Sequence, residues 1–364
     1  MDNSEAVIYL AGCAVNGVIP DKSRLKGVDM AGLYAEASRH MLGAVAAYAL
    51  ETAGIKDERF TQARAKALRK AVIQDADLRE ISGRLEDAGI WHVPLKGAVL
   101  GGYYPAFGLR EMSDVDILFD SSRAREVRKI MEGLGFHTED FGTCHHDEYH
   151  RPPVSNIEMH RVLIYTWINP AMCDYFADVR DKLIHDDGKK YACHFSREDF
   201  YLHMTAHTYV HYSEAGTGLR SLLDEYVYVR KFADSLDWGY ISRETGKMGI
   251  REFEEGLRPL ALGVFGGHEV RDSDREMLER IIGAGVYGHS EAGTENIMSG
   301  AFGGSRVRYV LAKIFPPFSK IKHMNPNVCK HKYLYPLFLV KRLIKAVTVK
   351  RKRVMAEIRG ILRM

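Results

Sequence analysis

Two aspartates one residue apart, Asp114 and Asp116, lie in the short apolar stretch 113–119. Residues i and i+2 of a β-strand point to the same face, so the two carboxylates would project side by side. Such like charges repel one another unless a hard divalent cation such as Mg²⁺ or Mn²⁺ lies between them. Phosphoryl and nucleotidyl transfer use this arrangement to polarise phosphates. The pair therefore predicts a metal site, although a solvated strand end in which Asp114 caps a turn would have the same sequence.

A third carboxylate occurs in a second alternating segment, residues 156–160. In a strand, Glu158 and His160 would share one face, while Ile157 and Met159 would face a core. A neighbouring strand that carries Glu158 would complete a metal-binding triad with the two aspartates, and Glu158 is also a candidate general base for an acceptor hydroxyl. His160 could contact phosphate or orient Glu158, although a lone strand histidine is more often structural.

Upstream of the aspartates lies a glycine-rich connection that begins at Lys96 and Gly97 and ends before Arg110. Gly97 follows a strand-like run and could open a helix, which would place free backbone N–H groups near a triphosphate. Lys96 and Arg110 would supply positive charge for the same phosphates. Ordinary turn chemistry and a solvated lysine would explain the same residues without a ligand.

The spacing of apolar residues indicates which elements hold these segments, and it changes twice along the chain. Residues 1–89 have helical periodicity, notably at 30–50 and 63–85. Residues 90–196 contain strand-length apolar runs at 91–95, 115–119 and 154–164, and helical patterns return over 197–364. We therefore predict an α+β fold, with a small mixed β-sheet core at 90–196 between an N-terminal helical region at 1–89 and a C-terminal helical region.

The order of these motifs resembles a known family. The quoted pieces are Leu95-Lys96-Gly97, then Gly108-Leu109-Arg110-Glu111-Met112-Ser113-Asp114-Val115-Asp116, then Ile157-Glu158-Met159-His160. They resemble the polymerase-β-type nucleotidyltransferase superfamily and, more narrowly, its poorly characterised bacterial nucleotidyltransferase family proteins. Most of the superfamily has a Gly-Ser pair where this chain has Gly97-Ala98.

The resemblance implies a nucleotidyltransferase that moves an NMP from an NTP to a hydroxyl of a small molecule, sugar or peptide and releases pyrophosphate. It implies Mg²⁺ or Mn²⁺ as the metal, with Asp114, Asp116 and Glu158 as metal-binding and catalytic residues. The expected nucleotide-binding residues are Lys96, Gly97, Arg110, Ser113 and His160. The spacing from Arg110 to Asp114 is similar to that in CCA-adding and poly(A) polymerases. RNA 3′-end or protein nucleotidylation therefore stays an alternative, as does a catalytically degenerate nucleotide-binding module.

Three histidines, His203, His207 and His211, are spaced four residues apart in a helical segment. Histidines at i and i+4 can bind zinc, but the H-E-x-x-H signature is absent, so a structural role against the α/β unit is favoured. In the next helical segment Arg220 and Asp224 are spaced for an ion pair within one helix.

The charge of the chain is unevenly distributed. Residues 330–364 contain eleven Lys and Arg and one acidic residue, whereas the whole chain has a net charge of only +3. This tail reads as a basic amphipathic helix over 334–363, with packing on the acidic body favoured over a polyanion or lipid contact. RNA stays a possible partner through the tail, and the oligomeric state is left open.

The five cysteines are scattered and form no C-x-x-C pair, so they indicate neither a disulfide framework nor a zinc site. An acidic N-terminus without a long apolar run argues against a signal peptide, and no stretch of membrane-spanning length occurs. Together these features predict a cytoplasmic protein.

Overall fold

The computed structural model describes residues 1–139, 141–142, 144–166, 169–214, 216–267, 269–286, 303–316, 321, 332–348 and 355. A four-stranded sheet lies at its centre, formed by β1 (His92–Pro94), β2 (Val115–Phe119), β3 (His146–Arg151) and β4 (Ser155–His160). The strand order is β1-β2-β4-β3; β2 and β4 are parallel, whereas the two outer pairs are antiparallel. Two short strands, β5 (Leu183–His185) and β6 (Cys193–Phe195), form a separate antiparallel pair. The predicted mixed sheet and α+β class are confirmed.

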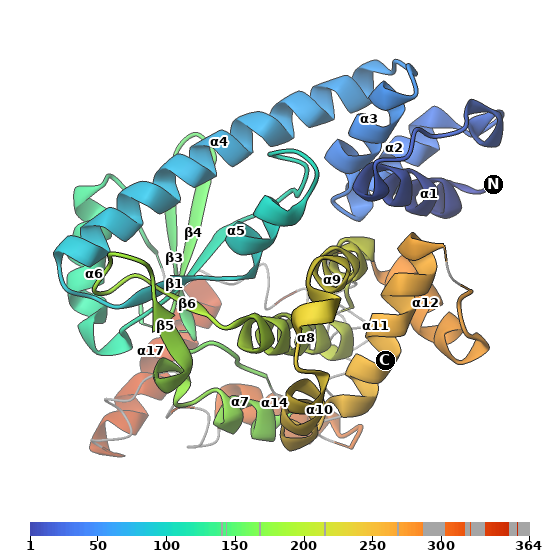
Figure 1. Ribbon diagram of the computed structural model, residues 1–364. Helices are drawn as coiled ribbons and strands as arrows, with labels where there is room; N and C mark the ends of the chain where they lie inside the picture. The colour runs from blue at the N-terminus through green and yellow to red at the C-terminus, as the bar shows by residue number, and fades with distance from the viewer. Residues whose placement is uncertain are drawn as a thin grey trace.

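Helices cover both faces of the sheet (Figure 1). On one face, Val115, Ile117 and Phe119 of β2 pack against α4 (Glu58–Asp87) and α6 (Ala124–Gly133). On the other face, Leu118 of β2 packs with α8 (Arg197–Glu214). The period-2 alternation of β2 therefore divides its side chains between two hydrophobic cores, and Asp116 belongs to the α8 face.

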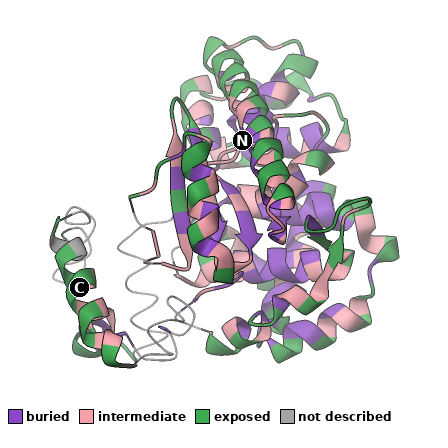
Figure 2. Ribbon diagram, turned by 90° about the vertical axis from the view of Figure 1, so that its left-hand side faces the viewer, coloured by how far each residue is buried: buried purple, intermediate pink, exposed green. Residues whose placement is uncertain are grey.

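The N-terminal and C-terminal helices share a third hydrophobic core. It joins helices that are far apart in the sequence: α1 (Asn3–Asn16), α2 (Met30–Arg39), α3 (Gly43–Thr52), α9 (Leu219–Phe232) and α11 (Arg251–Gly266). Figure 2 places the buried residues on the sheet and on the helix faces around it. The predicted region boundaries at residues 89 and 196 stay a prediction. The helical regions before and after the sheet contact each other directly in this third core.

Five further helices lie in the part of the chain that the structure describes after the sheet. They are α7 (Pro170–Tyr175), α10 (Trp238–Lys247), α12 (Asp272–Ala284), α14 (Arg306–Ile314) and α17 (Tyr335–Thr348). Before β2, the short helix α5 (Lys96–Leu100) follows β1 and is continued by one 3₁₀ turn, η2 (Gly101–Tyr103). This short helix begins at the lysine and glycine that the sequence had singled out.

The structure differs from the sequence expectations at three places. The helical pattern at 30–50 forms two helices, because the chain turns at Met41, which has a positive φ of 53°. Strand β3 was not predicted, since its sequence His-Asp-Glu-Tyr-His-Arg lacks an apolar run. The expected helix at 334–363 is described as α17 to Thr348; the basic run at 350–354 and Pro326 lie outside the described residues.

Helix α17 leaves several of its apolar residues exposed, whereas Phe338 and Leu339 are half-buried. Leu337, Val340 and Ile344 are 66%, 53% and 60% exposed, and Figure 2 shows this end of the chain at the margin of the molecule. Packing of this helix on the body therefore stays a prediction. No helix among the described residues is long and apolar enough to cross a membrane.

Helices α8, α9 and α11 meet at a buried group that requires a proton. The Tyr201 hydroxyl lies 2.6 Å from Glu225 Oε1 and 2.8 Å from Glu254 Oε1, yet a tyrosine has only one O–H to donate. Arg258 donates to Glu254, so we expect Glu225 to be the carboxyl of the pair that keeps a proton. Burial raises the pKa of Glu225 from 4.5 to about 7, opposed by the Tyr201 hydrogen bond and reinforced by Glu254.

This raised pKa predicts that the fold loses stability as the pH rises. The contribution of the Glu225 proton is complete below pH 4.5 and is lost as the pH rises through about 7, on the order of 3 kcal/mol in total. Glu225→Gln keeps a donor to Tyr201 but cannot ionise, so its free energy of unfolding should change less between pH 5.5 and 8. Denaturant unfolding at the two pH values measures this, with Glu252→Gln on the exposed face of α11 as control. Equal pH dependence in Glu225→Gln and the native chain would contradict the assignment.

Candidate active site

The loop that leads into β2 is anchored from three sides. Glu111 Oε1 accepts a hydrogen bond from Ala44 N at the start of α3, at 2.9 Å. Arg220 Nη1 of α9 donates to the Glu111 carbonyl oxygen, also at 2.9 Å. Lys70 Nζ of α4 donates to the Ser113 carbonyl oxygen at 2.9 Å. Three separate helices thus determine where the next residue, Asp114, enters the sheet.

Strand register brings the predicted carboxylates together. Asp116 of β2 is directly paired with Glu158 of the parallel neighbour β4, so their side chains project from the same face. His160 is on that face too: its Nε2 lies 3.0 Å from Asp116 Oδ1 and 3.5 Å from Glu158 Oε2. The Asp116 and Glu158 side chains are 21% and 19% exposed, so both are sheltered but reachable.

The ionisation of this group reflects its crowding. Burial raises the pKa of Asp114 to about 6, and the charges of Asp116 and Glu158 add to the effect. For Asp116, burial is outweighed by the hydrogen bond from His160, so its pKa is lowered. Burial alone would lower the pKa of His160, but its bonds to Asp116 and Glu158 raise it to about 10. The cluster of carboxylates therefore favours positive charge around it. The His160 imidazole stays protonated, and Asp114 keeps its proton up to about pH 6.

Lys96 lies inside the protein, at the first turn of α5 and opposite α8. Its Nζ donates to Thr208 Oγ1 at 3.1 Å and is 4.0 Å from Asp224 Oδ2. Burial lowers the pKa of Lys96 to about 8, because the nearby Asp224 only partly offsets the lost hydration and Arg110 opposes it. The lysine is therefore an ammonium at neutral pH with a single hydrogen-bond acceptor among the described residues.

Arg110 has a different position from the one expected for a free phosphate ligand. Its Nε and Nη2 donate to the two carboxylate oxygens of Asp224, each at 2.8 Å, and Tyr104 donates to the same carboxylate at 2.8 Å. Asp224 is fully buried and pairs with Arg110, not with Arg220 of its own helix. The third nitrogen, Nη1, faces Gly97. Arg110 thus ties the loop before β2 to α9.

Gly97 is required by close packing. A Cβ at this position would lie 2.8 Å from the Met112 sulfur and 3.1 Å from Arg110 Nη1, so no larger residue fits without movement. The start of α5 is therefore covered by the Arg110–Met112 segment. Ser113, the other predicted nucleotide-binding residue on this segment, hydrogen-bonds to Asp114 and thereby opposes the rise in its pKa.

Of the three histidines of α8 for which a structural role was favoured, His203 lies near the carboxylates. His203 is 1% exposed, and neither of its ring nitrogens has a hydrogen-bond partner among the described residues. Burial lowers its pKa to about 3, and the charges of Lys96 and His160 lower it further. His203 is therefore a neutral imidazole that is close enough to Asp116 for its charge to act on the ring. Arg220 Nε is also buried without a hydrogen-bond partner among the described residues.

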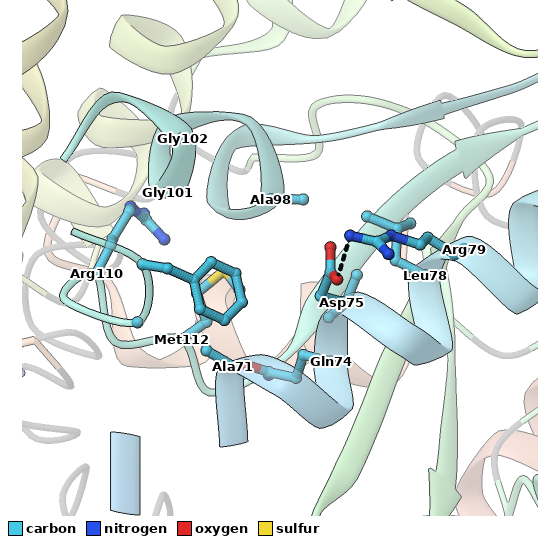
Figure 3. A pocket seen from close by; sticks show the side chains of 13 residues that line it. Ala71, Gln74, Asp75, Leu78, Arg79, Ala98, Gly101, Gly102, Arg110 and Met112 are labelled. Atoms are coloured by element: carbon cyan, nitrogen blue, oxygen red, sulfur yellow. Dashed lines mark ion pairs between the residues drawn. The ribbon is translucent and has the colours of Figure 1, made fainter. Parts of the chain in front are cut away.

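A cavity of about 310 Å³ lies on the opposite side of this segment, between α4 and the glycine-rich turn (Figure 3). Gln74 of α4 lines it, and the buried Gln74 Nε2 has no partner among the described residues. Val115 and Arg110 also line it, whereas none of the three carboxylates does. Because Val115 points away from Asp116, the cavity is separate from the carboxylate face.

Sequence reasoning missed two groups in this region. Lys70 lies on a long charged helix with nothing to distinguish it from its neighbours, and only the folded loop shows its bond to Ser113. His146 of β3 is paired with His160 and lies 3.4 Å from Glu158 Oε2 through its Nδ1. The alternation of His146, Glu148 and His150 was a signal that could have revealed this strand.

Comparison with known proteins agrees with the geometry. A family model described as an uncharacterised nucleotidyltransferase matches residues 26–266, which include α2 to α11 and every residue of the site described above. Searches of curated proteins and of solved structures each gave no match. Because the family match covers more than half of the chain, this protein belongs to the family of uncharacterised nucleotidyltransferases and is an enzyme of nucleotidyl-group transfer.

Proposed function

We propose that the enzyme transfers an NMP from an NTP to a hydroxyl of a small molecule, sugar or peptide, with Mg²⁺ or Mn²⁺ as cofactor and pyrophosphate as the second product. The observation that carries this proposal is the register of Asp116 with Glu158 on adjacent parallel strands, with Asp114 at the entrance to the first. A degenerate module would be favoured if Glu158 pointed away from the aspartates, so the register of Glu158 with Asp116 supports the enzyme.

The donor set fits a hard divalent ion. Asp114, Asp116 and Glu158 offer carboxylate oxygens, which Mg²⁺ and Mn²⁺ prefer. Burial is the main cause of the raised pKa of Asp114, and the charges of Asp116 and Glu158 add to it, so a bound cation would stabilise all three carboxylates. A bound ion would polarise the α-phosphate and neutralise the charge that develops on the leaving pyrophosphate.

The wall opposite the carboxylates is suited to the rest of the triphosphate. Lys96 offers an ammonium, and both Arg220 Nε and the ring nitrogens of His203 are without a hydrogen-bond partner in the described part of the chain. We assign these groups to the β- and γ-phosphates. Arg110 and Gly97 would position the segment from α5 to β2, and Asp224 would hold Arg110 in place. His160 would keep Asp116 oriented and lie beside the phosphate.

The acceptor would enter beside Glu158. Its hydroxyl oxygen attacks the α-phosphorus, the bond from that phosphorus to the pyrophosphate oxygen breaks, and Glu158 takes the hydroxyl proton as general base. We propose the cytoplasm as the compartment, because the five cysteines are scattered along the sequence and form no C-x-x-C pair.

The test is NTP binding and pyrophosphate release by the full chain with Mg²⁺, with Mn²⁺ and with a chelator. We expect metal-dependent NTP binding, and pyrophosphate release when a hydroxyl acceptor is present. Metal-dependent binding without release for any acceptor class would favour the degenerate module. Release that needs RNA or a protein acceptor would favour the alternative that the basic tail suggests, and absence of metal-dependent binding would refute the proposal.

Replacing Lys96 tests whether this lysine binds the β- and γ-phosphates of the NTP. We expect Lys96→Met to weaken Mg²⁺–NTP binding by about 10- to 100-fold, because a hydrogen bond to a charged group contributes about 1.5–3 kcal/mol. Calorimetry of NTP binding measures the loss, and Lys129→Met on the exposed face of α6 is the matched control. Weakening should be smaller for the nucleoside monophosphate than for the triphosphate. Equal NTP affinities of Lys96→Met and the native chain would remove Lys96 from the site.

A further inference from the structure

A second row of side chains lies beside the carboxylates on the same face of the sheet. In the antiparallel β3–β4 pair, Glu148 is opposite Glu158 and His146 is opposite His160. The register therefore places Asp116, Glu158 and Glu148 in one row and the imidazoles of His160 and His146 in the next. One row offers hard oxygen ligands, and the other offers nitrogen ligands that suit transition metals such as Zn²⁺ far better than Mg²⁺.

The spacing around Glu158 also suits metal coordination. Its Oε2 is 3.4 Å from His146 Nδ1 and 3.5 Å from His160 Nε2. Both distances exceed the range of about 2.7–3.2 Å that N–H···O hydrogen bonds prefer. A tetrahedral ion with bonds of about 2.0–2.2 Å holds its ligand atoms about 3.3–3.6 Å apart. All three ligand atoms lie within 4.8 Å of one another, so a small turn of His146 would bring the two nitrogens to this separation.

The surroundings of the two imidazoles favour the same interpretation. Glu148 Oε1 lies 3.3 Å from His146 Nε2 and can accept its proton, which leaves the Nδ1 lone pair directed toward Glu158. A carboxylate behind a histidine in this way is the usual support of a zinc ligand. His145 Nε2 lies 3.0 Å from the same Nδ1 and would be its hydrogen-bond partner in the metal-free site or a further nitrogen ligand. The side chains of His146, Glu158 and His160 are 15%, 19% and 9% exposed.

We propose that His146, Glu158 and His160 bind one transition-metal ion of the Zn²⁺ class, next to the carboxylates that bind the Mg²⁺–nucleotide. Asp116 Oδ1, which is 3.0 Å from His160 Nε2, lies at the boundary between the two positions. This inference deepens the proposed function, since Glu158 belongs to both positions, but the binding of the ion does not depend on nucleotidyl transfer.

The experiment is a Zn²⁺ titration of the full chain in competition with a chromophoric chelator, in millimolar Mg²⁺ so that Mg²⁺ occupies the carboxylate position. We expect one Zn²⁺ per chain, and about a 100-fold loss of affinity in His146→Ala, which removes a ligand from the sheet's edge strand. His150→Ala is the matched control, because it removes an imidazole from the same strand without touching Glu158. Equal Zn²⁺ affinity in His146→Ala and the native chain, or no stoichiometric binding, would overturn the proposal.

A second readout identifies the ligands directly. X-ray absorption of the Zn²⁺-loaded chain should show two imidazoles in the native protein and one in His146→Ala, whereas coordination by oxygen alone would refute the assignment. Mg²⁺-dependent NTP binding is measured in the same preparations. Zn²⁺ binding without NTP binding would refute the proposed function and leave the Zn²⁺ site standing. NTP binding without Zn²⁺ binding would refute the Zn²⁺ site and leave the proposed function standing.

Discussion

Replacing Asp116 by asparagine is expected to reduce kcat by at least about 1000-fold, which corresponds to about 4 kcal/mol of lost transition-state stabilisation. Asp116 is the central carboxylate of the site, with Asp114 two residues before it and Glu158 directly beside it in register. Asparagine has nearly the same shape but no negative charge, so it would weaken the hold on a divalent ion without disturbing the packing of β2. Pyrophosphate release at saturating Mg²⁺ and NTP measures the effect.

The same substitution has a consequence that does not depend on turnover. The hydrogen bond and charge of Asp116 are large causes of the raised pKa of His160, which is about 10 against the opposing effect of burial. In Asp116→Asn this imidazole should titrate at a lower pH, which NMR of the ring protons can follow. A change in the His160 pKa without a change in turnover would place Asp116 in a structural pair rather than in catalysis.

Asp120→Asn is the matched control for this experiment. Asp120 follows the same strand and caps the next turn by accepting from Ser122 N at 3.0 Å, a role that asparagine fills about as well. This variant should keep the turnover of the native enzyme. If Asp116→Asn kept turnover within about tenfold of Asp120→Asn, the proposed metal site would be wrong.

The strand that carries the aspartates could be predicted because local pattern and tertiary structure agree there. The alternation of Asp114, Val115, Asp116 and Ile117 is strong enough to predict β2, and the alternation around Glu158 predicts β4. Their pairing could be expected only through the family resemblance, because register between separate strands is a property of the folded sheet. The structure shows that pairing directly, with Asp116 opposite Glu158.

The remaining parts of the site depend on contacts that sequence spacing does not encode. Arg110 and Asp224 are separated by 114 residues, so the ion pair that fixes Arg110 could not be anticipated, and the nearer Arg220 was the natural guess. Lys70 reaches Ser113 across 43 residues. Strand β3 was missed because its alternation is between polar side chains, although this polarity is what makes His146 chemically interesting.

Replacing Asp224 by asparagine is expected to destabilise the protein by about 3–5 kcal/mol, the usual cost of leaving one charge of a buried pair without its partner. Asp224 is fully buried and accepts two hydrogen bonds from Arg110 and one from Tyr104. Asparagine would direct an amide donor toward the guanidinium, where a carboxylate oxygen now accepts. Denaturant unfolding measures the loss, with Asp234→Asn at an exposed position in the 3₁₀ turn just after α9 as control.

Activity should fall as well, for an electrostatic reason. The charge of Asp224 is the largest influence that supports the ammonium of Lys96, whose pKa burial has already lowered to about 8. Without that carboxylate the pKa of Lys96 should fall further, so that less of the lysine is charged at neutral pH. NTP binding by Asp224→Asn should therefore weaken more steeply between pH 6.5 and 8 than binding by the native enzyme, and identical pH profiles would contradict this role.

A double variant separates the two roles of the ion pair. Replacing both partners by apolar residues of similar size often restores the stability that a single substitution removes, because no unpaired charge is left buried. Arg110→Met with Asp224→Leu should therefore be more stable than Asp224→Leu alone. NTP binding should stay weak in the double variant, because Lys96 still lacks its counter-charge and the segment before β2 has lost its tie to α9. Recovery of both stability and binding would mean that the pair serves the fold alone, whereas recovery of stability without binding would assign it to the site.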